Sequence, residues 1–358
     1  MPGNKAGTSL RFIPARSRFV GKLSHGWVEN RGNTGSKPPL SDRHELCSYE
    51  PSGVDWMIKL DRILCPTDLS TDSDEALRYA VALARAYGAR LFLLHCSEEE
   101  SLGQPNGSPQ SESQINRLFT ASLAPHLGIS TMNELDWYGL VRNVDHIGRT
   151  IVREAMVQHA DLIVMRSRRR PHAAVLLGST AETVCRNAPC PVLVTHPREQ
   201  EWVGMSSGEI DLNRILIAHD FSHDSETAMN YGLAFAQEYQ AEVHLLHVLG
   251  TAGNEEPELV WSWSGKSSAY TFTAQKLQRA VPKEVHLWCK FVNVVRCGKV
   301  YEEILTYAKE HEIDLICMGV SGADSTLGKL LGSNVDRVLR EAPCPVLIAG
   351  SRDARQSQ

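Results

Sequence analysis

Short apolar runs alternate with amphipathic segments along most of the chain. The runs at 62–66 and 90–96 have few polar interruptions, which is typical of parallel strands buried on both faces. Between them, apolar residues recur at helical spacing after a group of N-cap candidates at 72–74, and Gly88 is expected to end the helix. Strands that alternate with helices in this way predict an α/β fold, in which helices cover both faces of a parallel sheet.

The rest of the first half continues this alternation. The stretch 97–113 is acidic and rich in Ser, Gly and Pro, so it is expected to form a loop. Helices are expected at 114–127, 150–159 and 179–187, and strands at 131–137, 161–165 and 192–195.

The landmarks then repeat in the same order. Segments 62–70, 93–96, 160–165 and 186–193 correspond to 214–222, 245–248, 313–318 and 340–347. Matching positions are 152 to 154 residues apart, and so constant a shift indicates an internal duplication. The chain is therefore expected to form two tandem doubly wound parallel-sheet domains of the Rossmann-like kind, at 57–198 and 213–351, joined by a polar linker at 199–212.

Residues 1–56 differ from the rest of the chain. They are rich in Gly, Ser, Pro, Asn and Arg, show no sustained periodicity, and contain no acidic residue before Glu29. The apolar core of a secretory signal is missing, while an organelle transit peptide and a translation start at Met57 are both open alternatives. We expect a disordered extension, so that a chain beginning at Met57 keeps the melting temperature of the full chain.

Composition and charge exclude several functions. The chain has 42% hydrophobic and 22% charged residues and a net charge of -5, which gives no basic surface for nucleic acid. No apolar run approaches the ~20 residues that span a bilayer. Nine cysteines include no CxxC pair or zinc-like spacing, and most lie in apolar runs, as buried free thiols do. These features predict a cytoplasmic protein.

The second half contains a strand, a glycine-rich loop and a helix start in direct succession. Gly319, Gly322, Gly332 and Ser333 follow an apolar run with the spacing G-x2-G-x9-G-S. Such a loop lets backbone N–H groups approach a phosphate, and a helix N-terminus adds unpaired donors and the positive end of a dipole. It is not a Walker A loop, because Lys329 precedes Ser333 by four residues. The alternative is a loop without a ligand, in which Ser333 caps the helix.

The repeated landmarks together resemble the universal stress protein family in its tandem two-domain form. The glycine spacing and the Ala-Pro-Cys-Pro-Val run before the last strand carry the resemblance, which covers about 60–196 and 213–350. In nucleotide-binding members of this family, ATP lies at the carboxyl ends of the strands. The resemblance therefore implies ATP as the ligand, with Mg²⁺ left open. It assigns the adenosine end to Ala218, Asp220 and Val248 and the phosphates to Gly319, Gly322, Gly332 and Ser333.

General chemistry is consistent with this assignment. Ligands of open α/β sheets lie beyond the carboxyl ends of the strands, at a switch in strand order. The carboxylate of Asp220 can accept from an adenine amino group or a ribose hydroxyl, and the backbone of Val248 can read the adenine edge. The alternative for Asp220 is an Asx-turn or an N-cap before the following helix.

The first half departs from the motif. Arg166 and Arg169 stand at the two loop-glycine positions, eight residues separate Arg169 from Gly178, and Cys96 replaces the valine. A side chain where the backbone needs a positive φ is unfavourable, so ATP binding of the family kind is not expected here. Two alternatives stay open, a site for another phosphorylated ligand or acidic partner and a solvated basic loop. The arginines concerned are Arg166, Arg168, Arg169 and Arg170.

Other candidate residues are weaker. His95 and His247 end strands and are expected to be hydrogen-bonded rather than ligands, and His219 lacks a third group for a catalytic relay. Trp261 and Trp263 are expected to pack on their own domain. With no paired carboxylates, nucleophile elbow or metal cluster in the sequence, we expect a non-enzymatic stress-response protein that binds an adenine nucleotide, but neither nucleic acid nor membrane. The alternatives are a slow ATPase or phosphotransferase, and a ligand-free structural or chaperone-like module.

The two halves are expected to pair. Their last strands, at 192–195 and 346–349, are apolar, and an exposed edge of this kind invites association. Members of the family often dimerise through this strand. An intramolecular pseudo-dimer is therefore predicted, with further oligomers left open.

Overall fold

The computed structural model describes residues 58–71, 73–98, 112–126, 135–167, 178–195, 201–204, 208–250, 268–321 and 331–350. These residues belong to one compact unit. The expected extension 1–56, the pair Trp261 and Trp263, and the predictions made for them lie outside the described residues.

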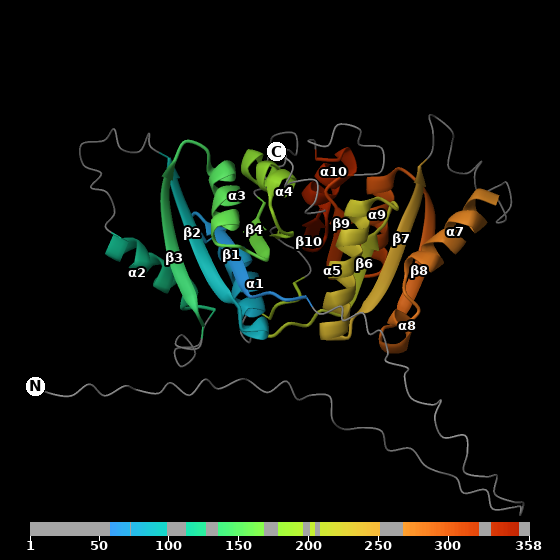
Figure 1. Ribbon diagram of the computed structural model, residues 1–358, viewed down its shortest axis with the longest axis horizontal. Helices are drawn as coiled ribbons and strands as arrows, with labels where there is room; N and C mark the ends of the chain where they lie inside the picture. The colour runs from blue at the N-terminus through green and yellow to red at the C-terminus, as the bar shows by residue number, and fades with distance from the viewer. Residues whose placement is uncertain are drawn as a thin grey trace, which may run out of the picture. The chain divides into compact units, whose positions relative to one another are not determined.

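Each half contains strands and helices in alternation (Figure 1). The first half consists of β1 (Arg62–Thr67), α1 (Asp74–Tyr87), β2 (Arg90–Glu98), α2 (Glu112–Leu123), β3 (Trp137–Val144), α3 (Ile147–Val157), β4 (Leu162–Arg166), α4 (Ser179–Asn187) and β5 (Val192–Thr195). The second half consists of β6 (Arg214–Ala218), α5 (His223–Tyr239), β7 (Glu242–Gly250), α7 (Ser268–Ala280), α8 (Val285–Trp288), β8 (Phe291–Gly298), α9 (Val300–Glu310), β9 (Leu315–Gly319), α10 (Ser333–Glu341) and β10 (Val346–Ala349).

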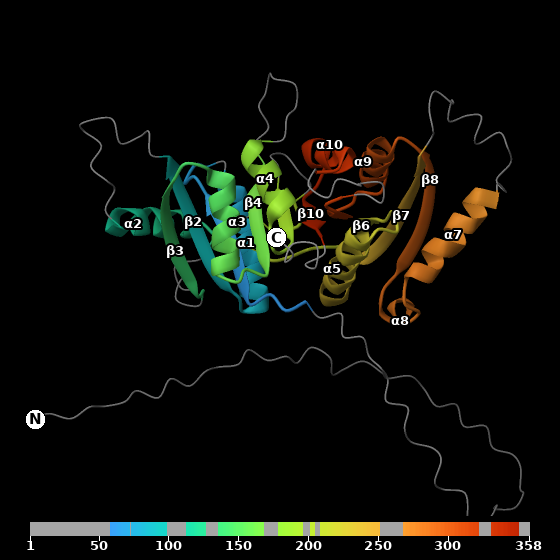
Figure 2. The same ribbon diagram turned by 45° about the horizontal axis from the view of Figure 1, so that its top comes forward.

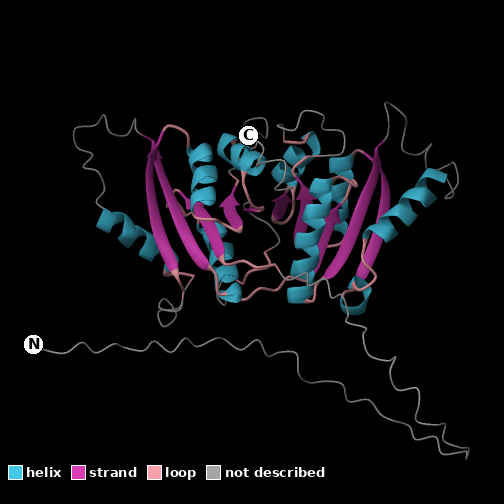
Figure 3. Cartoon of the chain, in the orientation of Figure 1, coloured by secondary structure: helices cyan, strands magenta, loops and turns pink. Residues whose placement is uncertain are grey.

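The strands form one ten-stranded sheet in the order β3-β2-β1-β4-β5-β10-β9-β6-β7-β8 (Figure 3). Neighbouring strands are parallel within each half, whereas β5 and β10 pair antiparallel, with Leu193 opposite Leu347. In both halves the strand order reverses between the first and fourth strands, which are β1 and β4, and β6 and β9. The predicted α/β class with Rossmann-like halves is confirmed.

Each face of the sheet has its own hydrophobic core. One core joins α1, α2, α5 and α7 to the sheet, and the other joins α3, α4, α9 and α10. Alternate strand residues serve the two cores, as with Ile63 and Leu64 in β1. Figure 2 shows α5 beside β6, and α7 next to the edge strand β8. Helices on both faces explain why the strands read as continuous apolar runs.

Most predicted elements agree with the structure, and the third strand is the main correction. Gly88 ends α1 with a φ of 64°, as the sequence predicted. The strand expected at 131–137 is instead β3 (Trp137–Val144), which begins where the prediction ended. It lies at the edge of the sheet, and Tyr138 is 49% exposed, so its mixture of polar and apolar residues lacks the pattern of a buried strand.

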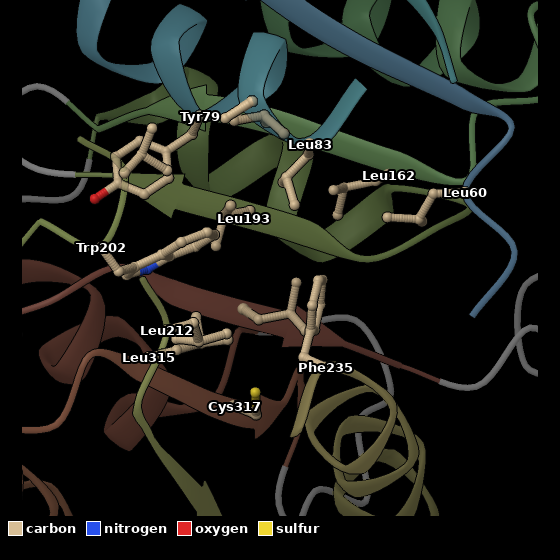
Figure 4. Packing of buried hydrophobic residues seen from close by; sticks show 14 of the residues in the cluster. Leu60, Tyr79, Leu83, Leu162, Leu193, Trp202, Leu212, Phe235, Leu315 and Cys317 are labelled. Atoms are coloured by element: carbon tan, nitrogen blue, oxygen red, sulfur yellow. The ribbon is translucent and has the colours of Figure 1, made fainter. Parts of the chain in front are cut away.

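The segment between the halves is packed against both of them. Trp202 is 2% exposed and makes an edge-on contact with Tyr79 of α1, with ring centroids 4.7 Å apart. In Figure 4 its indole lies between Tyr79 and Leu193 on one side and Leu212 and Leu315 on the other. Residues from both halves therefore share one core around Trp202.

The duplication extends to individual hydrogen bonds. Asp161 accepts the N–H groups of Asp61 and Arg62 at 2.9 and 3.0 Å through Oδ2. Asp314 accepts those of Asn213 and Arg214 in the same way, at 2.9 and 2.8 Å. These aspartates thus fix the start of the first strand of each half to the loop before the fourth, which aligns the opposite ends of the strands.

Candidate functional site

The predicted site residues gather at the carboxyl ends of three adjacent strands. Ala218 ends β6, Val248 lies near the end of β7, and Gly319 ends β9. The side chains of Ala218 and Val248 are half-buried and contact the same core, on the face that α9 and α10 cover. Asp220 lies two residues beyond the end of β6, at the reversal in strand order where ligands of such sheets bind. Gly322 lies outside the described residues.

The turn after β6 fixes Asp220. Its Oδ1 accepts the backbone N–H of Ser222 at 3.0 Å and the hydroxyl of Ser222 at 2.5 Å. Ser222 is the N-cap of α5, because its hydroxyl oxygen accepts the N–H of Ser225 at 3.2 Å. Asp220 therefore makes the Asx-turn that the sequence left as an alternative, and this turn orients the carboxylate at the sheet edge.

The residues on either side of Asp220 reinforce the turn. Phe221 has a φ of 65°, which is unusual for a residue with a side chain, and its N–H donates to Nδ1 of His219 at 3.1 Å. Lys276 of α7 lies 3.8 Å from the centroid of the Phe221 ring. The carbonyl of His219 accepts from Nδ1 of His247 at 2.7 Å. A hydrogen-bonded His247 was expected from the sequence and is confirmed, whereas the bond from Phe221 to His219 was not expected.

The first half builds the same turn with a different acceptor. Leu69 has a φ of 61°, and its N–H donates to the hydroxyl oxygen of Thr67 at 3.0 Å. Asp68 accepts from the N–H and hydroxyl of Ser70, as Asp220 does from Ser222. His95, predicted to be hydrogen-bonded, is 3.1 Å from the Thr67 carbonyl through Nδ1. His219 thus stands where the first half has Thr67. Comparison of the two repeats would have pointed to His219 as the residue that accepts this backbone N–H.

Gly319 lies where β9 packs closely on α5. A positive φ, one of the two reasons expected for this glycine, is wrong, because its φ does not lie in the positive range. A Cβ here would lie 2.9 Å from the carbonyl carbon and Cβ of Asp224 and from the nitrogen of Ser225. Since most of these are backbone atoms in the first turn of α5, Gly319 is a point of close approach between β9 and α5.

The start of α10 lies next to the end of β9. The N–H of Gly332 donates to the carbonyl of Val320 at 3.3 Å, and Gly332 is the N-cap of the helix. Ser333 is therefore the first helical residue rather than the cap, and its side chain is exposed. The first-turn N–H groups of α10 have no intrahelical acceptor, so the helix offers donors and positive potential at this edge. Ser321, which follows β9, is bonded to α5, because its hydroxyl donates to the carboxylate of Asp224 at 2.6 Å.

The first half uses the same space for an ion pair. Arg166 stands at the position of Gly319, and its guanidinium lies 3.4 Å from Glu75 of α1, with both side chains 13% exposed. The equivalent helices begin at different points, since α1 starts at Asp74, which corresponds to Glu226 inside α5. Arg168, Arg169 and Arg170 lie outside the described residues.

Buried titratable groups in the two halves differ. Burial lowers the pKa of His219, which is 3% exposed. In the first half, burial raises the pKa of Cys96, which stands at the position of Val248, to about 11. Cys96 is therefore a neutral thiol at physiological pH. Among the described cysteines, Cys65 and Cys317 are buried and free, as the sequence predicted, and Cys190 and Cys344 are buried as well.

The sequence of this chain is similar to those of known proteins. The model of the universal stress protein family matches residues 59–196 and 212–350. A universal stress protein of Mycolicibacterium smegmatis is 25% identical over 309 residues, which cover 81% of this chain and 97% of that protein. One of Methanocaldococcus jannaschii is 30% identical over 143 residues, covering 40% of this chain and 84% of that protein.

A solved structure shares the fold. The crystal structure of a universal stress protein from Archaeoglobus fulgidus has a TM-score of 0.53 and 18% identity, and the match covers 82% of this chain and 99% of that one. No helix in the described parts of this chain is both long and apolar enough to cross a membrane. Since the family model matches both halves, which make up most of the sequence, the chain belongs to the universal stress protein family and carries two of its domains in tandem.

Proposed function

We propose that the second half binds ATP at the carboxyl ends of β7, β6 and β9, and that the protein acts in a cytoplasmic stress response. In this proposal, nucleotide changes the conformation or a partner interaction, and catalysis is not its role. One observation carries this proposal. The apolar side chains of Ala218 and Val248, the oriented carboxylate of Asp220 and the start of α10 lie together where the strand order reverses.

The chemistry of these groups fits the two ends of an adenine nucleotide. Ala218 and Val248 offer apolar contacts for the adenine ring, and Asp220 offers an oriented acceptor for an amino or hydroxyl group. The start of α10 offers donors and positive potential for phosphates, with the exposed Ser333 hydroxyl beside them. Any Mg²⁺ would be bound through the phosphates, which is the usual mode for this ion.

The first half supports the proposal by contrast. At the position of Gly319 it holds Arg166 in an ion pair with Glu75, and at the position of Val248 it holds a cysteine. We therefore assign the first half a structural role, as the partner that pairs with β10 through β5. Tyr87 and Tyr239 are equivalent residues 152 positions apart. Burial is the main cause that raises the pKa of Tyr87, and Tyr239 is the next. The antiparallel pairing of the equivalent strands β5 and β10 is the arrangement expected of an intramolecular pseudo-dimer.

A matched pair of substitutions tests the assignment. Ser333→Asp places a carboxylate at the first residue of α10, where it would repel phosphates but favours the helix. Ser179→Asp makes the same change at the first residue of α4, which also follows a glycine. We expect Ser333→Asp to weaken ATP binding roughly tenfold or more and Ser179→Asp to leave it unchanged, as measured by isothermal titration calorimetry.

The melting temperature of each variant, measured without nucleotide, is the control, and both should match the parent protein. Equal loss of affinity in the two variants would place the site elsewhere. Absence of ATP binding by the parent protein at pH 7.5, together with no nucleotide released from it on denaturation, would overturn the proposed function.

A further inference from the structure

We propose that His219 is a positioning residue that makes nucleotide binding by the second half sensitive to acid, because its ring holds the turn that carries Asp220. The inference deepens the proposed function and rests on it. His219 is not a nucleotide contact in this proposal, since it acts through the backbone of Phe221.

The hydrogen bond fixes the protonation state of the ring. A backbone N–H can only donate, so Nδ1 of His219 accepts from Phe221 as an unprotonated nitrogen, and the ring proton resides on Nε2. Protonation of the imidazole would add a hydrogen to Nδ1 and place two donors against each other. Because His219 is only 3% exposed, water cannot readily replace the lost acceptor.

Loss of this bond acts directly on the proposed site. Phe221 has a φ of 65°, a conformation that persists when its surroundings enforce it. Asp220 lies between His219 and Phe221, and its carboxylate is oriented by the N–H and hydroxyl of Ser222, the residue after Phe221. Release of the Phe221 N–H therefore loosens both neighbours of Asp220 and the start of α5.

The first half provides a natural comparison within the same chain. Thr67 occupies the position of His219, and its hydroxyl oxygen accepts the N–H of Leu69, whose φ is 61°. A threonine hydroxyl does not titrate in the physiological range, so this copy of the turn is insensitive to pH. The second half therefore has a titratable acceptor at a position where a neutral one is sufficient to form the turn.

The charged groups around His219 set the pH range. Burial lowers its pKa, with Asp220 and Glu226 of α5 opposing this and His247 of β7 and Lys276 of α7 adding to it. The ring thus stays neutral until the pH falls below about 6.5, the ordinary pKa of a histidine side chain. Protonation of His247 would not break its bond to the His219 carbonyl, because its Nδ1 already donates there.

The experiment compares ATP affinity from pH 7.5 to pH 5.0 in the parent protein and in His219→Thr, His219→Ala and His244→Phe. A single group whose pKa differs by one unit between the free and bound forms changes affinity about tenfold. We expect a loss of about this size for the parent below pH 6.5, relative to His219→Thr, which restores the acceptor used in the first half. His219→Ala, which has no acceptor for the Phe221 N–H, should bind ATP more weakly than His219→Thr at every pH. Because ATP titrates equally in all samples, differences between proteins report on the protein.

His244→Phe is the matched control. His244 is also a buried histidine with a lowered pKa, and the first half has Phe92 at this position, but its Nδ1 faces Tyr307, away from the turn. This variant should keep the acid-sensitive profile of the parent. The same pH profile in the parent and in His219→Thr would overturn the inference.

A second measurement separates the inference from the proposed function. The amide of Phe221, followed by NMR without nucleotide, should lose its protection from exchange as the pH falls below 6.5, while that of Leu69 keeps it after correction for intrinsic exchange rates. If both amides respond alike, the inference is wrong even where ATP binds. Failure of the parent to bind ATP at pH 7.5 overturns the proposed function alone.

Discussion

Replacement of Trp202 by alanine is expected to cost about 3–5 kcal/mol of the free energy of unfolding, as measured by urea denaturation. Trp202 is 2% exposed, packs edge-on against Tyr79, and belongs to the core that contains Leu193, Leu212 and Leu315. Removal of the indole leaves a cavity between the two halves, which the sheet on either side cannot close. The expected loss is large because residues of both halves lose a common partner.

An exposed aromatic residue provides the control for Trp202. Phe272 of α7 is 69% exposed, so Phe272→Ala should change the free energy of unfolding by no more than about 0.5 kcal/mol. A similar small effect for Trp202→Ala would show that the segment joining the halves is a passive connection. Two separate unfolding transitions in Trp202→Ala would show that the indole couples the two halves.

The importance of Trp202 could not be predicted from the pattern alone. The segment 199–212 is polar and contains two glycines, which is typical of a linker. The pair Trp202 and Val203 was the available signal, since two large apolar residues in a polar stretch need a surface to cover. That surface is made by residues distant in the sequence, among them Tyr79 and Leu315. It exists only in the folded chain, so the sequence pattern alone does not indicate it.

The elements that the sequence predicted well are those with strong local rules. Residues 192–195 and 346–349 agree with β5 and β10 to the residue, because both are short apolar runs after an Ala-Pro-Cys-Pro turn. The strand β3 was misplaced, because an edge strand with one solvated face need not follow the pattern of a buried one. Local pattern thus predicts buried parallel strands better than the strands that border the sheet.

The candidate site divides in the same way. Asp220 and Gly319 were identified by their places at the ends of strands, and in the structure Asp220 lies two residues beyond β6 while Gly319 is the last residue of β9. The roles of their neighbours depend on three-dimensional contacts, as with His219 against Phe221 and Asp224 against Ser321. The replacement of a glycine by Arg166 in the first half was plain in the sequence, but the ion pair of Arg166 with Glu75 was not.

Gly319→Ala is expected to lower the free energy of unfolding by about 1–3 kcal/mol, although it adds a single methyl group. That methyl would lie 2.9 Å from the carbonyl carbon and Cβ of Asp224 and the nitrogen of Ser225. These atoms belong to the first turn of α5, which Ser222 caps, so they can give way only if the helix shifts from β9. Such a shift would also disturb Asp220, and ATP affinity should fall in parallel. Gly319→Arg would act through the same clash, so it does not test the phosphate site by itself.

Gly250 supplies the matched control for this prediction. It ends β7 in the same half, and a Cβ built there meets no atom within 4 Å. Gly250→Ala should therefore be neutral or stabilise the protein by up to about 1 kcal/mol, because it reduces the freedom of the unfolded chain. Both variants are compared by thermal unfolding and by calorimetry with ATP. Equal stability of the two variants would show that α5 does not press on Gly319, and the glycine would then be explained by the ligand rather than by packing.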